Sequence, residues 1–142
     1  MAEFRPRFPK KSNRRLYQKG WFYEQEAKKI IYKKLFDAGL KCFLIKAPYG
    51  YPFDFSAFIP PNSIYFWEIR FTYKNYVYIS KKKIEKTKQK IKGYNGFVFK
   101  YFVLAFFGGK YNYEIFEINL VEKPRDYLIK KNKKEEKRDN RK

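Results

Sequence analysis

Residues 64–71 read Ile-Tyr-Phe-Trp-Glu-Ile-Arg-Phe and are apolar on both faces except for Glu68 and Arg70. A run of this kind is typical of a central strand that is covered on both sides. A carboxylate in the middle of such a strand loses its hydration, so it requires a charged side chain or a bound cation as a partner. Because strand side chains alternate between faces, Glu68 and Arg70 point to the same face. The stretch therefore predicts charged groups at the centre of a sheet.

The elements on either side of this strand follow from spacing and turn residues. Upstream, we expect a helix that ends before Gly39 and two strands, at residues 21–38, 41–47 and 53–59. Downstream, we expect a lysine-rich helix capped by Ser80 and two further strands, at residues 81–92, 97–107 and 113–118. This order predicts a single-domain α/β sandwich in which helices flank a central mixed β-sheet.

Both ends of the chain are basic and lack a periodic apolar face. Residues 1–18 read as a flexible arm, and residues 122–142 read as a basic C-terminal tail that forms a short helix or frays. The ordered α/β domain is therefore expected over residues 19–121.

The charge balance indicates the class of partner. The 142 residues contain 34 Lys and Arg but 14 Asp and Glu, a formal net charge of +20. An A/T-rich genome would enrich lysine codons, but it would not remove acids. Such an excess repels itself unless a polyanion neutralises it, which favours nucleic acid over an anionic membrane surface.

Composition also excludes several chemistries. The chain has no histidine, which excludes His-metal sites and Ser-His or Cys-His catalysis. The single cysteine, Cys42, excludes a disulfide framework or a zinc finger. No signal peptide is visible, and the most apolar stretch, residues 97–109, is too short to span a bilayer. We therefore expect a soluble cytoplasmic protein that works with DNA.

Three acidic residues occupy unusual positions. Asp54 lies on the strand next to Glu68, and helical spacing turns Glu24 toward the apolar face of the first helix, with Glu26 facing solvent. One interpretation is structural: Glu68–Arg70 or Asp54–Arg70 is a buried ion pair, and Glu24 is a helix cap. The other is a three-carboxylate site for Mg²⁺ or Mn²⁺, which suits metal-assisted hydrolysis of a phosphodiester.

The ordered pattern of Glu24, Asp54 and Glu68-Ile69-Arg70 resembles the PD-(D/E)XK nuclease superfamily. More narrowly, Lys-Gly-Trp-Phe-Tyr-Glu at residues 19–24, opening a helix, resembles the start of archaeal Holliday junction resolvases. A glycine-containing loop, the Asp54 strand, the Glu68 strand and a lysine-bearing helix follow in the order of that family. The resemblance covers residues 17–107 and implies a restriction-endonuclease-like fold.

The resemblance also implies a mechanism and a partner. Asp54 and Glu68 would bind Mg²⁺ or Mn²⁺, with the Ile69 carbonyl as a third ligand and Glu24 as a further acidic residue of the catalytic site. Family members are homodimers that cut symmetric strands of a four-way DNA junction.

One departure from the motif is Arg70, which stands where the family has lysine. Arginine cannot act as a base because its pKa exceeds about 12, although it can stabilise charge on the phosphate electrostatically. Alternatively, Lys74, Lys46 or Lys81 supplies the ammonium group, or the domain binds DNA without cutting it.

The predicted DNA-binding residues are basic or aromatic. The N-terminal turn of the lysine-rich helix, with free N–H groups, suits a phosphate, and Tyr49 or Tyr51 could stack on an unpaired base. The alternatives are a solvated helix face and a rigid turn. The predicted DNA-binding set is Lys19, Tyr49, Tyr51, Lys74, Lys81, Lys82 and Lys83. Aromatic residues among Phe99, Tyr101, Phe106 and Phe107 are expected at a dimer interface.

The leading interpretation is a metal-dependent endonuclease that resolves four-way junctions. A nicking or repair nuclease of the same superfamily is the second interpretation. A non-catalytic nucleic-acid-binding module is the third, and a peripheral membrane protein is disfavoured because no helix shows a large apolar face.

Overall fold

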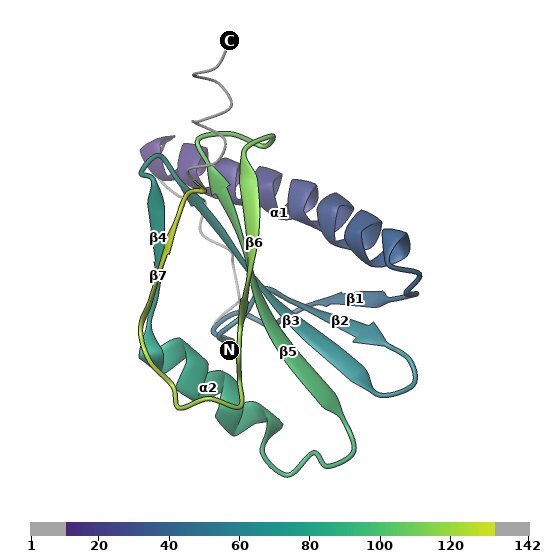
Figure 1. Cartoon of the computed structure of the whole chain (residues 1–142). Helices are drawn as coiled ribbons and strands as arrows, with labels where there is room; N and C mark the ends of the chain where they lie inside the picture. Colours follow the sequence, from purple (N-terminus) through teal and green to yellow (C-terminus); the bar gives the residue numbers. More distant parts are fainter. Residues whose placement is uncertain (1–10, 133–142) are drawn as a thin grey trace, which may run out of the picture.

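The computed structural model describes residues 11–132, with side chains in the first helix from Lys19 onward. Its centre is a five-stranded mixed sheet in the order β1-β2-β3-β5-β6 (Figure 1). Strands β3 and β5 run parallel, and the other neighbours are antiparallel. The strands are β1 (Phe43–Lys46), β2 (Phe55–Ile59), β3 (Ser63–Thr72), β5 (Val98–Phe107) and β6 (Tyr113–Ile118). The predicted central mixed sheet is confirmed.

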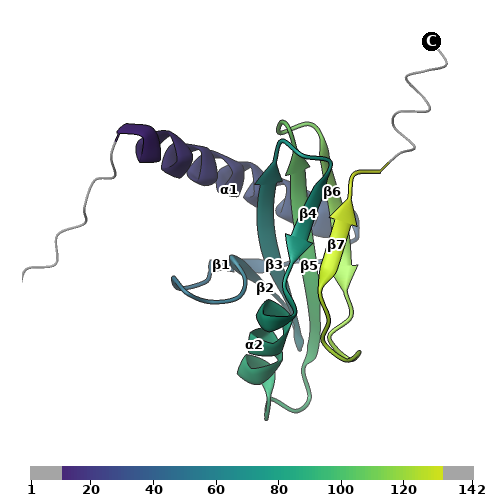
Figure 2. The ribbon, with the colours of Figure 1, turned by 90° about the vertical axis from the view of Figure 1, so that its left-hand side faces the viewer.

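Different elements cover the two faces of this sheet. Helix α1 (Lys11–Asp37) packs on one face through Tyr23, Ala27, Ile31 and Leu35. The other face carries helix α2 (Lys81–Ile91) and a two-stranded antiparallel sheet of β4 (Tyr76–Ile79) and β7 (Tyr127–Lys130). Figure 2 views the molecule from the side of α2, β4 and β7. The molecule is therefore a sandwich with two separate cores.

The alternation along β3 places its residues in these two cores. Phe66 belongs to the core under α2, and Trp67 belongs to the core under α1. Glu68 and Arg70 follow the parity of Phe66, so both lie on the α2 face, as the two-residue repeat predicts. Strand β3 lies in the middle of the sheet, between β2 and β5, which confirms that the run at 64–71 is a central strand.

The ends of the chain are more ordered than the sequence suggests. Helix α1 begins at Lys11, so the prediction of a flexible arm is wrong for residues 11–18, whereas residues 1–10 lie outside the described residues. Strand β7 lies within the expected tail, so the prediction of a short helix or frayed end is wrong for residues 127–130. The reason is tertiary: Tyr127 and Ile129 are buried in the α2 core by pairing with β4. Residues 133–142 of the expected tail lie outside the described part.

Most of the aromatic residues that are expected at a dimer interface on β5 lie in the cores. Tyr101 and Phe107 are buried in the core under α2, and Phe106 is buried under α1. Phe99 packs against the α2 core. The prediction of a dimer interface is therefore wrong for Tyr101, Phe106 and Phe107, because β5 supplies two cores rather than one; for the partly buried Phe99 it stays a prediction. Within residues 11–132, no helix is both long enough and apolar enough to cross a membrane.

Candidate active site

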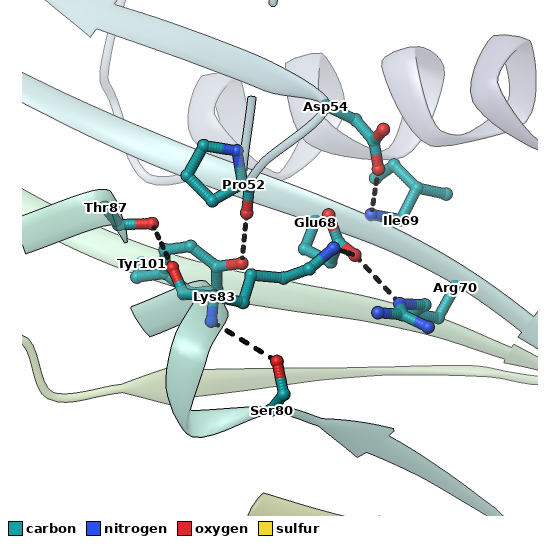
Figure 3. Close-up of polar contacts among 9 residues, drawn as sticks. All are labelled: Pro52, Asp54, Glu68, Ile69, Arg70, Ser80, Lys83, Thr87 and Tyr101. Carbon is teal, nitrogen blue, oxygen red and sulfur yellow. Dashed lines mark hydrogen bonds and ion pairs between the residues drawn. The ribbon is translucent and has the colours of Figure 1, made fainter. Parts of the chain in front are cut away.

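Glu68 is the most buried carboxylate at the centre of the sheet. Its side chain is 6% exposed, and its Oε2 atom accepts hydrogen bonds from Arg70 Nε at 2.8 Å and Lys83 Nζ at 2.6 Å (Figure 3). The Glu68–Arg70 pair of the structural interpretation is therefore present, and the Asp54–Arg70 pair is not among the ion pairs of the described residues. Two cations on one oxygen offset the desolvation of this carboxylate.

Asp54 lies immediately before β2, where the backbone leaves the ladder with β3. Its backbone N–H donates to the Trp67 carbonyl at 2.8 Å, and its side-chain Oδ2 accepts from the Ile69 N–H at 2.7 Å. The Asp54 carboxylate thus accepts from the Ile69 N–H, a backbone donor of β3 that β2 is too short to pair. This is favourable because a buried N–H without a partner is destabilising. This contact fixes Asp54 beside Glu68, the residue that precedes Ile69 on β3.

The pKa of Asp54 reflects both its burial and the nearby charge of Glu68. Burial and, next, the negative charge of Glu68 raise the pKa of Asp54 to about 6, against the lowering effect of the Ile69 N–H. Like charges that share a site disfavour simultaneous ionisation. Asp54 and Glu68 therefore form a pair that a cation between them would stabilise, and we call them the carboxylate pair.

Glu24 is less closely associated with the pair than the sequence suggests. It projects from α1, its Oε1 accepts a hydrogen bond from Lys46 Nζ of β1, and its effect on the pKa of Asp54 is smaller than that of Glu68. The side chain of Glu26 is 16% exposed against 26% for Glu24, so the prediction that Glu26 is the solvated one is wrong. Glu26 is covered because it pairs with Lys29 and Lys110.

Lys83 is the residue of the site that sequence reasoning assigned to another role. It was expected at the DNA surface, but its side chain is 25% exposed and its ammonium group lies on Glu68. Three other lysines are predicted as sources of the ammonium group that the motif lacks. Lys46 pairs with Glu24, Lys74 donates to the Tyr76 hydroxyl, and the side chain of Lys81 is exposed. The signal was helical spacing: Lys83 precedes buried Ile84 and lies four residues before buried Thr87, at the edge of the stripe that faces β3.

The N-terminal turn of α2 is already capped. Ser80 Oγ accepts from the Lys83 N–H at 3.3 Å, as predicted, and Asp126 Oδ1 accepts from the Lys81 N–H at 2.6 Å. The expectation of free N–H groups for a phosphate is therefore wrong for these two. The side chains of Lys81 and Lys82 are exposed and can still meet DNA.

The remaining predicted DNA-binding residues differ in solvent exposure and in the contacts that they make. Tyr49 is fully exposed in the loop before Asp54. Tyr51 is 42% exposed and has Lys90 Nζ 3.8 Å above its ring. Lys19 donates to the Tyr73 hydroxyl and lies 4.5 Å from the ring centroid of Phe71. These contacts hold Lys19 against the end of β3 rather than directing it to solvent.

Tyr101 is a further residue of the site that the sequence did not reveal. It is fully buried on the face that carries Glu68, and its hydroxyl donates to the Pro52 carbonyl at 2.8 Å (Figure 3). Burial and the charge of Glu68 raise its pKa, so the hydroxyl stays protonated and keeps donating. Tyr101 therefore anchors the segment that delivers Asp54.

The donor set of the pair suits a hard cation. Asp54 Oδ1 and Glu68 Oε1 accept no hydrogen bond within residues 11–132. Because the N–H and C=O of a strand residue point to the same side, the Ile69 carbonyl is directed toward Asp54 as well. The described residues contain no group of three Asp, Glu, Cys or His side chains able to hold a metal together, so Glu24 does not complete the three-carboxylate site expected from the sequence. Mg²⁺ is typically bound by one or two carboxylates with water and substrate phosphate, so Asp54 and Glu68 fit it.

Comparisons with known proteins bear on the fold. The structure is similar to that of Hjc, a Holliday junction resolvase from the archaeal hyperthermophile Archaeoglobus fulgidus, with a TM-score of 0.50 and 16% sequence identity. The match covers 79% of this chain and 84% of that chain. No protein-family model and no curated protein matches the sequence. At this identity the likeness is one of fold, and it confirms the expected restriction-endonuclease-like sandwich.

Proposed function

We propose that the chain is a Mg²⁺-dependent endonuclease that cuts branched DNA, with the four-way junction as its main substrate; Mn²⁺ could replace Mg²⁺. The observation that supports this most is the carboxylate pair, held beside two cationic side chains on a sheet of the resolvase fold. Two neighbouring buried carboxylates are energetically unfavourable, so their presence in a basic protein suggests a function. Metal-dependent hydrolysis of a phosphodiester requires such carboxylates to bind the metal ion.

Each residue of the site has a role in this proposal. Asp54, Glu68 and the Ile69 carbonyl hold the ion, and Glu24 contributes negative charge from α1. The bound ion would lower the pKa of an attacking water and offset charge on the phosphate. Arg70 stands at the motif position where the family has lysine, and Lys83 provides the missing ammonium group from α2. Arg70 stabilises charge that develops on the phosphate.

The decisive experiment compares substrates and metal. We expect the protein to cut a labelled four-way junction in Mg²⁺, to cut the matched linear duplex much more slowly, and to cut neither in EDTA. Gel analysis of both substrates under single-turnover conditions measures this. Equal rates on both substrates would reduce the proposal to a general nuclease of the same superfamily.

A non-catalytic DNA-binding module is the second candidate. It is favoured by one observation: Glu68 already carries two cations, so the site is electrostatically satisfied without a metal. Junction binding that is unaffected by EDTA, without cleavage in Mg²⁺ or Mn²⁺, would establish this alternative.

A homodimer is part of the proposal, through a surface other than β5. Three exposed apolar side chains gather on the C-terminal half of α1 and the turn that follows it: Tyr32, Phe36 and Leu40. Tyr32, Phe36 and Leu40 also line a cavity of about 700 Å³. Cys42, the last residue of that lining, directly precedes the exposed edge strand β1, and an edge strand beside an apolar patch is a typical association surface.

Phe36→Glu is therefore expected to convert a dimer into a monomer, because Phe36 is 79% exposed in this patch and a carboxylate loses its hydration when an interface buries it. Light scattering coupled to gel filtration measures the mass. Val121→Glu, at an exposed apolar residue outside the patch, is the matched control and should remain dimeric. A wild-type protein that is monomeric at micromolar concentration would contradict the proposal.

A further inference from the structure

An aromatic pocket of about 520 Å³ lies beside the candidate site. Six rings form its wall in an unbroken series, with neighbouring centroids 4.3 to 6.5 Å apart: Tyr51, Phe53, Phe66, Phe99, Phe97 and Tyr94. Phe53 and Phe66 are buried at the floor, whereas Tyr51, Phe97 and Tyr94 are exposed at the rim. The volume is within the ~300–1,000 Å³ range of ligand pockets. The wall thus combines rings that belong to the core under α2 or pack against it with rings that are exposed to solvent.

The rim is held in place without a ligand. Tyr94 lies in the turn between α2 and β5, where Gly93 and Gly96 have φ values of 89° and 85° that favour glycine. The Tyr94 N–H donates to the Ile91 carbonyl at 3.1 Å, and Asn62 Nδ2 donates to the Gly96 carbonyl at 3.0 Å. The turn is therefore fixed to both α2 and the β2–β3 connection. A rim preorganised in this way loses little entropy when it binds a flat ligand.

The charge of the pocket is positive. Lys90 Nζ lies 3.8 Å above the Tyr51 ring, and no acidic side chain lines the pocket among the described residues. Exposed rings together with a cation are the combination that binds single-stranded nucleic acid, in which bases stack and phosphates pair with lysine.

The pocket and the carboxylate pair share two structural elements. Tyr51 lies three residues before Asp54 on the segment that Tyr101 anchors at Pro52. On α2, Lys83 contacts Glu68 and Lys90 contacts Tyr51; a spacing of seven residues keeps both on one flank of the helix, about 10 Å apart along its axis. A DNA strand with a phosphate near Glu68 would therefore have a nearby nucleotide at the pocket. Figure 1 shows that α2 follows β4 and leads through a turn into β5.

We propose that the aromatic pocket takes one unstacked nucleobase of the DNA strand whose phosphate lies at Asp54 and Glu68. The inference rests on the proposed function, because the DNA strand in question is the substrate of the proposed nuclease. A base that is already unpaired enters most easily, since no pairing energy is lost. The pocket would thus favour cleavage next to an unpaired nucleotide at a branch point.

Binding of a labelled strand tests the pocket separately from cleavage. The probe is a short oligothymidylate with one central 2-aminopurine, whose fluorescence falls when it stacks on an aromatic ring, and the buffer contains EDTA. We expect wild type to quench the probe and Tyr94→Ala to bind it about tenfold or more weakly, with the quench lost. Tyr94→Phe, which keeps the ring, should behave as wild type.

Tyr111→Ala is the matched control, because Tyr111 is an exposed tyrosine outside the pocket, in the β5–β6 turn. Wild-type affinity and quenching in Tyr94→Ala would overturn the inference. If that variant instead changed only the oligomeric state, the pocket would be an interface between copies of the chain and the inference would also fail. Junction cutting by wild type together with an unaffected Tyr94→Ala would overturn the pocket alone. Loss of the quench in Tyr94→Ala without any cleavage by wild type would uphold the pocket and overturn the proposed nuclease.

Discussion

Asp54→Asn is expected to abolish cleavage of junction DNA while making the metal-free protein more stable at pH 7. Asparagine keeps an oxygen for the Ile69 N–H but removes the charge that binds the ion and repels Glu68. Junction binding should be retained or tightened because repulsion from phosphate is lost. Single-turnover rate and melting temperature measure the two effects, which a purely structural residue would not separate.

The gain in stability depends on pH in a defined direction. Because the folded-state pKa of Asp54 is raised to about 6 from 3.8, the folded protein binds the proton more tightly than the unfolded chain. Its contribution to stability is therefore lost as pH rises from about 4 to 6 and stays lost above pH 6. Asp54→Asn should match wild type near pH 4 and exceed it by up to about 3 kcal/mol above pH 6, in EDTA.

Metal addition provides the contrasting outcome for the same pair of proteins. Mg²⁺ should raise the melting temperature of wild type and leave that of Asp54→Asn unchanged, since only the native wild-type site binds it. An Asp54→Asn protein with full activity would remove the carboxylate pair from the mechanism.

Lys83→Ala is expected to slow cleavage about 10²-fold, comparable to the loss of one preorganised charge donor in other enzymes. Stability should fall little, because Arg70 still pairs with Glu68. Lys86→Ala is the matched control: it removes the same charge from an exposed position of the same helix, outside the predicted DNA-binding set, and no ion pair of the described residues involves Lys86. Cleavage rate and melting temperature should both stay near wild type in that control.

The double variant separates catalysis from folding. Removing Lys83 and Arg70 together leaves Glu68 buried and unpaired, which should cost about 3–5 kcal/mol, far more than the sum of the single variants. Chemical denaturation of the four proteins measures this coupling. Additive stabilities, or Lys83→Ala at the wild-type rate, would show that the ammonium group on Glu68 has neither role.

The sequence predicts the sheet and the carboxylate pair because both depend on local patterns. The apolar run around Glu68 and the two-residue repeat place Glu68 and Arg70 on one face, as the structure has them. Strand β7 was missed because its short pattern in a basic segment becomes a strand only by pairing with β4.

Other features depend on contacts that no local pattern shows. The role of Lys83 requires the packing of α2 against β3, and the capping of Lys81 by Asp126 joins residues 45 positions apart. The burial of Glu26 depends on Lys110, which reaches it from beyond β5. Side-chain periodicity identifies the face of an element, but it does not identify which element will cover that face.

The Asp54–Ile69 and Lys83–Glu68 contacts each join residues only 15 positions apart. The loop-closure entropy for assembling the acids and their cations is therefore small, and it changes by only about 0.6 kcal/mol for a doubling of loop length. Apart from Glu24 and Lys19, the residues of the candidate site, the predicted DNA-binding set and the pocket lie in one continuous stretch, from Tyr49 to Tyr101. We therefore expect changes in β6, β7 or most of α1 to affect the chemistry of the site only through the stability of the two cores.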